Sequence, residues 1–221
     1  MAGGRTGHGA VWCGVPAAAA LLAANIVVGR KLSRSRWLRE RETAAILALQ
    51  AHRTRGRDRL ATLVSTASDV PSSVVHGLIA AVLLQRRTQQ WRTAAAPARA
   101  LVLETAIYLG AGALVNRDRP DVPRLDREQP TSSFPSGHQG ATVALMVMYL
   151  GLARRIRRPW LRAVVVAACL GYPSVLAWAR VYTGMHHPSD VVAGTVNGLV
   201  AGLLTWPDLG TVPNSDQLRM G

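Results

Sequence analysis

The chain has 221 residues and a formal net charge of +14 at pH 7. This length suits one domain or one compact helix bundle. Its basic residues are arginines apart from Lys31, and they lie mainly between apolar runs, where they suit lipid headgroups better than nucleic acid. Cys13 and Cys169 both fall inside apolar segments, so we expect buried thiols and no disulfide framework. The composition therefore argues against a nucleic-acid-binding protein and favours a membrane protein.

Six apolar segments have about the length that is needed to cross a membrane. They cover residues 11–29, 60–84, 97–115, 137–153, 161–179 and 188–206. The first could also be a secretory signal peptide, but it is long for one and has no clear cleavage site. The second is the weakest, because polar residues and Pro71 interrupt its middle, and Pro173 is expected to kink the fifth. The pattern predicts an all-α fold, a polytopic membrane helix bundle of about six transmembrane helices with the active site at one membrane face.

Residues 30–59 separate the first two segments and hold ten basic side chains. One interpretation is a solvated loop with a short interfacial helix at 43–50, and the other is a basic collar that attracts anionic lipid. We therefore divide the chain into 1–59, the first transmembrane helix with a basic interfacial loop; 60–206, the membrane helical core; and 207–221, a polar tail. Glu104 stands alone inside the third segment, where it could pair with a cation such as Arg99 or face a polar interior.

Arg180, His186 and Asp190 form a cluster of ionisable residues between the fifth segment and the start of the sixth. Charged groups beside a membrane span are costly, so such a cluster indicates a functional site. On a helix, the four-residue spacing would put His186 and Asp190 on one face. A carboxylate held against one ring nitrogen fixes the tautomer and leaves the other nitrogen free to attack or to move protons. His187 lacks this spacing and is predicted to be structural.

The connection between the third and fourth segments carries a second cluster. Arg117 and Arg119 follow the third segment, and guanidinium groups match the oxygens of a phosphate dianion. Ser136, Gly137 and His138 open the fourth segment, and the unpaired backbone N–H groups of a helix start bind anions. Gly137 would let the backbone approach the anion closely. These residues predict a phosphate site with His138 at its rim.

Three motifs made from these residues resemble the signature of the type-2 phosphatidic acid phosphatase superfamily. They are Arg119-Pro120, Pro135-Ser136-Gly137-His138 and Arg180-x5-His186-x3-Asp190, in the order and the helical context of that family. The resemblance covers residues 60–206 and implies a membrane lipid phosphatase. Gly112 stands where the family has a lysine, and Ala179 stands where it has a serine. Arg117 could in part replace the missing lysine.

The residues and the resemblance together imply covalent catalysis without a metal or another cofactor. His186 would attack phosphorus and form a phosphohistidine, with Asp190 orienting its ring. His138 would protonate the leaving oxygen and then activate water. Binding of the phosphate would fall to Arg119, Arg180, Ser136, the Gly137 backbone and Arg117.

A membrane lipid is the expected substrate, and the bilayer is the expected surrounding. Polyprenyl-linked cell-wall precursors are slightly favoured over phosphatidic acid and phosphatidylglycerophosphate. Two alternatives stay open: a lipid phosphotransferase that uses the same intermediate, and a non-catalytic lipid-binding relative, which Gly112 suggests. The arginines of 86–92 and 154–158 indicate a cytoplasmic face opposite the site, and this places the site outside the cell membrane. The basic residues of 30–59 oppose that assignment.

Overall fold

The computed structural model describes residues 7–126 and 130–206, and every regular element in these ranges is a helix. In chain order the helices are α1 (Gly7–Arg34), α2 (Arg36–Gln50), α3 (Arg55–Thr66), α4 (Val70–Thr88), α5 (Trp91–Ala94), α6 (Ala96–Val115), α7 (Gly137–Ala153), α8 (Pro159–Tyr182) and α9 (Pro188–Thr205). The predicted all-α fold is thereby confirmed. The predicted polar tail, 207–221, lies outside the described residues.

Three segments of the described chain are long and apolar enough to cross a membrane, judged by length and composition. They are Val15–Arg34, Trp91–Val115 and Pro159–Tyr182. A fourth results if α3 and α4, which meet at a bend of 59°, count as one broken span. The bend falls at the polar interruption that the sequence places in the second apolar segment. A membrane helix bundle is therefore confirmed, while the count of six spans stays a prediction.

The closest approach of two helix backbones in the core is between α7 and α9. Gly194, Gly198 and Gly202 follow one another at four-residue intervals on α9. A Cβ atom on Gly198 would lie 2.3 Å from the Gly140 carbonyl oxygen of α7, so no larger residue fits there without a shift. Stripes of small residues at this spacing let membrane helices approach closely. The contact brings the beginning of α7 beside the beginning of α9.

Glu104 of α6 is buried in this core. Its Oε1 makes no hydrogen bond with the described residues, and a Cβ atom on Gly140 would lie only 2.0 Å from that oxygen. The ion pair with Arg99 that the sequence allowed is therefore not formed, and Glu104 is buried against Gly140 of α7, while the polar interior that the sequence also allowed stays a prediction. Gly140 is the residue that leaves room for the carboxyl group.

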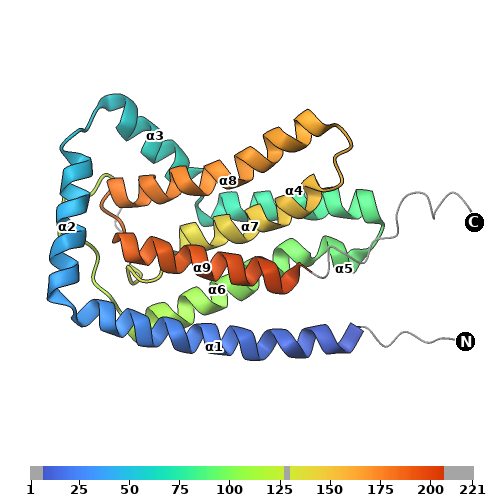
Figure 1. Ribbon diagram of the computed structural model, residues 1–221, viewed down its shortest axis with the longest axis horizontal. Helices are drawn as coiled ribbons and strands as arrows, with labels where there is room; N and C mark the ends of the chain where they lie inside the picture. Colours follow the sequence, from blue (N-terminus) through green and yellow to red (C-terminus); the bar gives the residue numbers. More distant parts are fainter. Residues whose placement is uncertain (1–6, 127–129, 207–221) are drawn as a thin grey trace, which may run out of the picture.

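Helix α2 lies across one end of the bundle, where it crosses the direction of the long helices (Figure 1). It begins after Ser35, whose Oγ accepts a hydrogen bond from the Leu38 N–H, and it is longer than the predicted stretch 43–50. Its inner face buries Glu42, Ile46 and Gln50. The connections α6–α7 and α8–α9 lie at this same end. The division at residue 59 stays a prediction, and the buried face of α2 links the first unit to the core.

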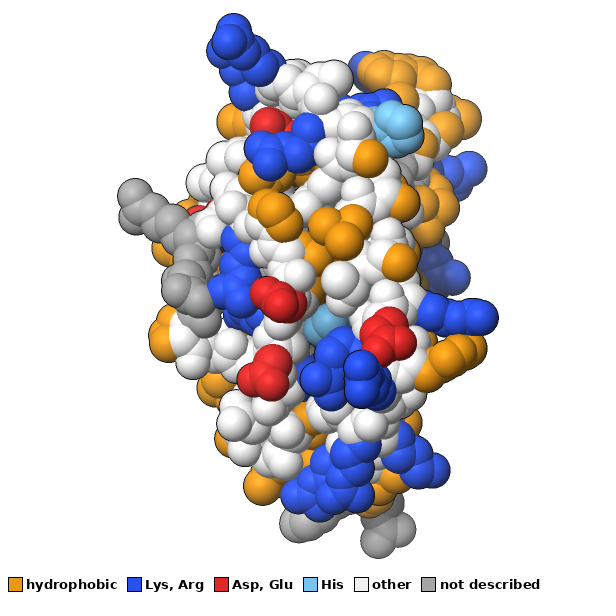
Figure 2. Space-filling view, turned by 90° about the vertical axis from the view of Figure 1, so that its left-hand side faces the viewer, with side chains coloured by type: hydrophobic (Ala, Val, Ile, Leu, Met, Phe, Trp, Pro, Cys, Tyr) orange, Lys and Arg blue, Asp and Glu red, His pale blue; other side chains and the backbone are white. Residues whose placement is uncertain are grey.

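The end of the molecule covered by α2 is rich in charged side chains (Figure 2). Arg36, Arg39 and Arg41 of α2 are exposed there, and so is Trp37, which lies under the Arg41 guanidinium at 4.1 Å. A helix that presents tryptophan and arginine to its surroundings is typical of a membrane–water interface. The interfacial position of this helix stays a prediction.

Candidate active site

His186 lies in the turn before α9, and not on the helix itself. Helix α9 begins at Pro188, with His187 as its N-cap residue. Asp190 is therefore in the first helical turn, where its Oδ2 accepts the His187 N–H at 2.9 Å. The prediction that His186 and Asp190 share a helix face is wrong, because the turn bends away from the helix axis before reaching His186. The prediction that His187 is structural agrees with its capping position.

The ring of His186 is held by a backbone carbonyl. Its Nδ1 lies 2.7 Å from the Ser133 oxygen, whereas the distance from Nδ1 to Asp190 Oδ2 is 4.0 Å. A carbonyl can only accept, so a neutral His186 carries its proton on Nδ1 and leaves the Nε2 lone pair free. Asp190 was expected to orient the ring directly. It acts one step removed, since its Oδ2 accepts the Ser133 hydroxyl at 2.5 Å.

The His186 ring is neutral at ordinary pH. Burial lowers its pKa well below the usual histidine value, and the positive charges of Arg180 and Arg119 lower it further. His138 adds a smaller effect in the same direction. These influences show that residues from all three motifs lie around one ring. A neutral imidazole in a positively charged surrounding is a nucleophile beside a site suited to an anion.

Arg180 is completely buried near the end of α8. Its Nη1 donates to Asp126 Oδ2 at 2.8 Å and to Ser65 Oγ at 3.3 Å. Its Nε and Nη2 make no hydrogen bond with any residue in the ranges 7–126 and 130–206. Buried guanidinium nitrogens normally find acceptors, so two of these nitrogens without one are a strong sign of an anion site.

Arg119 and Ser136 complete the predicted cluster. Arg119 Nη1 donates to the carbonyl oxygen of Met185, the residue before His186, at 2.6 Å. Ser136 precedes α7 as its N-cap residue, and its N–H donates to the Asp190 carbonyl at 3.0 Å. The Ser136 Oγ is buried and makes no hydrogen bond with the described residues. The starts of α7 and α9 are thus tied together beside His186.

Packing against α6 requires a glycine at position 137, which the sequence did not indicate. A Cβ atom at this position would lie 3.1 Å from the Tyr108 ring of α6. Even alanine would therefore press on the aromatic ring. The close approach of the Gly137 backbone to a phosphate stays a prediction.

Arg117 is engaged by carboxylates at both ends of its guanidinium group. Its Nη1 donates to Asp190 Oδ1 at 2.5 Å and its Nη2 to Glu42 Oε2 at 2.7 Å. The Arg117 side chain is only 4% exposed. Its predicted contact with phosphate stays a prediction, and it would require breaking these ion pairs. The observed geometry connects Arg117 to Asp190 and not to the anion site.

Two residues of this site, Glu42 and Ser133, were missed by sequence reasoning. The sequence pattern could have indicated that Glu42 is buried, because Glu42, Ile46 and Gln50 recur every four residues and form the inner face of α2. Gln50 reaches across the same end, where its Nε2 donates to the Pro123 and Tyr182 carbonyls at 2.9 Å each. Ser133 acts through its hydroxyl and its backbone carbonyl in an irregular loop, for which no periodic pattern exists.

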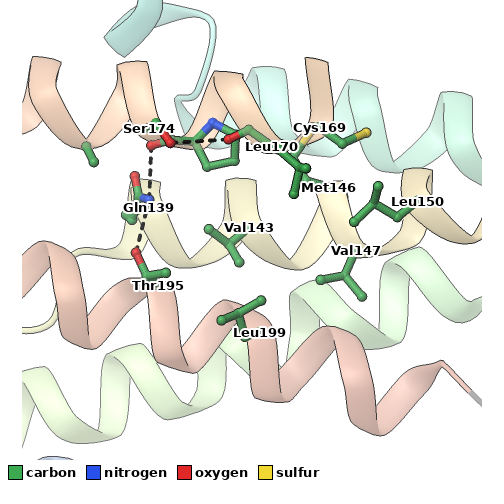
Figure 3. A pocket seen from close by; sticks show the side chains of 12 residues that line it. Gln139, Val143, Met146, Val147, Leu150, Cys169, Leu170, Ser174, Thr195 and Leu199 are labelled. Carbon is green, nitrogen blue, oxygen red and sulfur yellow. Dashed lines mark hydrogen bonds between the residues drawn. The ribbon is translucent and has the colours of Figure 1, made fainter. Parts of the chain in front are cut away.

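Two cavities adjoin the cluster, and no metal site was found in the part of the chain that the structure describes. Within those ranges, no group of three or more His, Cys, Asp or Glu is arranged to hold a metal ion. A polar cavity of about 630 Å³ is lined by Arg119 and its neighbours in the α6–α7 connection. An apolar groove of about 270 Å³ runs between α7, α8 and α9 (Figure 3).

Comparisons with known proteins place these features in a family context. The model of the PAP2 superfamily matches residues 91–212. The decaprenylphosphoryl-5-phosphoribose phosphatase of Mycobacterium tuberculosis (strain CDC 1551 / Oshkosh) is 31% identical over 134 residues, which make up 59% of this chain and 68% of the relative. The protein of the same name from strain ATCC 25618 / H37Rv matches equally well.

Two solved structures share the fold. The transmembrane PAP2 type phosphatidylglycerolphosphate phosphatase from Bacillus subtilis superposes with a TM-score of 0.76 at 17% identity, covering 90% of this chain and 98% of that one. LpxE of Aquifex aeolicus gives a TM-score of 0.59 at 19% identity, covering 74% and 93% of the two chains. At these identities the similarity concerns the fold alone.

Proposed function

The chain belongs to the PAP2 superfamily, and from this premise we propose that it hydrolyses a phosphomonoester or diphosphate of a membrane lipid through a phosphohistidine on His186. The resemblance read from the three motifs is confirmed by this membership. The observation that carries the proposal is that two buried nitrogens of Arg180, Nε and Nη2, have no hydrogen-bond partner among the described residues and lie beside a neutral His186. Together they supply an anion-binding guanidinium and a nucleophile in one enclosed place.

The proposed first step is an in-line displacement. The Nε2 lone pair of His186 bonds to phosphorus, and the bond from phosphorus to the leaving oxygen breaks with its electron pair on that oxygen. Burial, Arg180 and Arg119 lower the pKa of His138 to about 3, so His138 is proposed to take up a proton when the phosphate dianion binds and to pass that proton to the leaving oxygen. For a phosphomonoester the leaving group is the lipid alcohol, and for a diphosphate it is the lipid monophosphate.

The second step regenerates the enzyme. His138, now neutral, takes a proton from water while the water oxygen attacks phosphorus and the P–N bond breaks. Arg119, Arg180, Ser136 and the Gly137 backbone are proposed to hold the equatorial phosphate oxygens, on which negative charge gathers in the transition state. The Ser133 carbonyl accepts the His186 Nδ1–H at 2.7 Å and supports the positive ring that forms while phosphorus is attached.

The apolar groove supports a lipid substrate with a long chain. Figure 3 shows Val143, Met146 and Leu199 lining it, with Gln139 at one end. Gln139 is held there by the Pro173 carbonyl and the Thr195 hydroxyl at 3.2 and 3.1 Å. Gln139 lies in the first turn of α7, so one end of the groove lies near the beginning of that helix. A hydrocarbon chain in the groove would present its phosphate to the site.

A polyprenyl-linked phosphate is the substrate that we favour. The relatives in Mycobacterium tuberculosis are named for a decaprenylphosphoryl-5-phosphoribose substrate, which combines a prenyl chain with a sugar phosphate. The apolar groove between α7, α8 and α9 suits a long chain, and the polar cavity beside Arg119 offers room for a polar headgroup. The preference for a polyprenyl chain over phospholipids rests on the names of these relatives.

The proposed site lies on the outer face of the cell membrane. Arginines of the α7–α8 connection and of the α4 C-terminus lie at the end opposite α2, as expected for a cytoplasmic face (Figure 1). The basic α2 lies at the active-site end, against that rule, and its exposed Trp37 supports a position at the interface. We therefore treat the α2 arginines as ligands for anionic headgroups and not as a topology signal.

A lipid panel tests the proposal. Purified full-length protein in detergent is given polyprenyl phosphate, polyprenyl diphosphate, phosphatidic acid and phosphatidylglycerophosphate, and phosphate release is measured. Wild type should release phosphate, His186→Ala should not, and His138→Ala should be slower by about 100- to 10,000-fold. Equal rates for wild type and His186→Ala on every lipid would overturn the proposal. Recovery of the phosphate on an added acceptor lipid would identify the phosphotransferase alternative instead.

A further inference from the structure

The buried ion network around Arg117 reaches out of the family-matched segment into α2. The family model matches residues 91–212, whereas Glu42 belongs to α2 (Arg36–Gln50). The Glu42, Arg117 and Asp190 side chains are 7%, 4% and 0% exposed. The carboxylates of Glu42 and Asp190 bind opposite ends of one guanidinium group, at 2.7 and 2.5 Å. Removing one partner of a buried ion pair leaves an uncompensated charge, so each member depends on the others.

Glu42 also binds the beginning of α9. Its Oε1 accepts the Ser189 N–H at 2.8 Å, one of the backbone donors that a helix leaves unsatisfied in its first turn. A carboxylate near a helix N-terminus is further favoured by the helix dipole. Arg117 reaches the same residue, because its Nη1 donates to Ser189 Oγ at 2.7 Å. The turn that carries His186 is therefore fixed from outside the core by α2.

A continuous chain of short contacts leads from this network to the His186 ring. Asp190 Oδ2 accepts the Ser133 hydroxyl at 2.5 Å, and the Ser133 carbonyl accepts His186 Nδ1–H at 2.7 Å. A shift of the Asp190 carboxylate would move Ser133 and rotate the imidazole. Misplacement of a nucleophile by about 1 Å can lower a rate about 100-fold.

The charge of the network also suits the reaction. Two carboxylates and one guanidinium carry a net charge of −1, and His187 adds none because burial and Arg117 lower its pKa to about 4. Asp190 Oδ2 lies 4.0 Å from the His186 ring, which becomes positive when phosphorus is attached. With Glu42 uncharged, the network is neutral and this support is lost.

We propose that Glu42 is a positioning residue for phosphoryl transfer, which acts through Arg117 and Asp190 to fix the orientation of His186. The proposal rests on the function proposed above. It assigns Arg117 to the support of the nucleophile and assigns α2 to the active site. Glu42 touches neither the phosphate nor the lipid, so its removal should lower kcat and leave KM nearly unchanged.

Glu40 provides a matched control on the same helix. It is exposed and pairs with Arg36 at 2.8 Å in a surface contact of the i, i+4 type. Glu40→Gln therefore makes the same chemical change on α2 without touching the network. Glu42→Gln keeps the size of the side chain and can still accept the Ser189 N–H, so the helix should remain docked.

The experiment compares wild type, Glu42→Gln, Glu40→Gln, Arg117→Gln and the double variant Glu42→Gln/Arg117→Gln as full-length proteins in detergent. Each is assayed with a lipid phosphate and with a water-soluble aryl phosphate, and rates are divided by the folded fraction from thermal unfolding. We expect kcat of Glu42→Gln to fall about 10- to 100-fold on both substrates with KM within about twofold. Glu40→Gln should match wild type, and the double variant should be no slower than Arg117→Gln alone.

The outcomes separate the inference from the function on which it rests. A kcat of Glu42→Gln equal to wild type, or a loss explained entirely by its folded fraction, overturns the positioning role. Additive losses in the double variant overturn the path through Arg117. If His186→Ala is as active as wild type on both substrates, the proposed function fails and the inference with it. If His186→Ala is inactive while Glu42→Gln is fully active, only the inference fails.

Discussion

Gly112→Lys tests how far the missing lysine limits the phosphate site. Gly112 lies in the last turn of α6, where the helix dipole favours a cation. A Cβ atom there would lie 3.6 Å from the Phe134 oxygen and 3.7 Å from Ser132 Cβ, which are ordinary contact distances. The Cβ atom of a lysine side chain therefore fits without displacing the backbone. It would begin beside the loop whose Ser133 carbonyl holds His186.

The expected gain in rate follows from the transition-state stabilisation that one preorganised charge supplies in a site without water. Such a group stabilises the transition state by roughly 2–4 kcal/mol, or about 30- to 900-fold in rate. Replacing glycine inside a helix also adds roughly 0.5–1 kcal/mol of stability, whatever the charge of the new residue. Gly112→Met shares the length and the helical gain of lysine but lacks its charge, so it isolates the electrostatic effect.

The assay is kcat/KM for phosphate release from a lipid phosphate, measured in parallel for wild type, Gly112→Lys and Gly112→Met. We expect Gly112→Lys to exceed Gly112→Met by at least about tenfold, which corresponds to about 1.4 kcal/mol. Equal values for the two variants would refute the reasoning that a cation is missing here. Silence of all three proteins, including wild type, would instead support the non-catalytic alternative.

Three further predictions concern the groove, the core and the N-cap of α9. Leu199→Trp narrows the groove, so that about two methylenes of the lipid chain lose their buried position, at about 0.8 kcal/mol each. KM for a long-chain lipid phosphate should therefore rise about tenfold, while KM for an aryl phosphate is unchanged. Equal changes in both KM values would contradict a chain-binding groove. Gly140→Ala places a Cβ atom 2.0 Å from Glu104 Oε1 and should lower stability by about 1–3 kcal/mol in thermal unfolding. The double variant Gly140→Ala/Glu104→Ala should lose less stability than the two single variants lose in sum, and a loss equal to that sum would count against this contact. Burial lowers the pKa of His187 to about 4. Between pH 6.5 and 4 the unfolded chain therefore binds more protons than the folded chain, and the free energy of unfolding should fall as pH drops through that window. His187→Gln should flatten this decline by up to about 3 kcal/mol, and an unchanged slope would show that other groups cause it.

The helical class and the three motifs could be predicted because each is a local property of the chain. Apolar runs of the length of a hydrocarbon layer indicate helices whatever their partners, since a membrane allows few other structures. Helices α7 and α9 begin at Gly137 and Pro188, where the sequence placed their starts. The residues Arg180, His186 and Arg119 carry their chemistry in their side chains, so their pattern could identify the family. Gly112 also stood out from sequence alone, as a missing member of that pattern.

The partners of those residues were decided by the tertiary structure. The four-residue spacing of His186 and Asp190 was read as a helix face, but the helix begins between them and a carbonyl from another loop holds the ring. Arg117 was read as a phosphate ligand, and the fold gives it two carboxylates. Glu42 and Ser189 are 147 positions apart, and no local period links them.

The sequence by itself thus predicted which groups bind phosphate and attack it, namely His186, Arg180 and Arg119. Only the packing of α2 across the bundle end decided that Glu42 and Asp190 share the Arg117 guanidinium group. The reason is physical. The chemistry of a side chain and the length of an apolar run are local properties of the chain. A buried ion pair exists only when the fold brings the charged atoms of distant residues to within about 3 Å of each other.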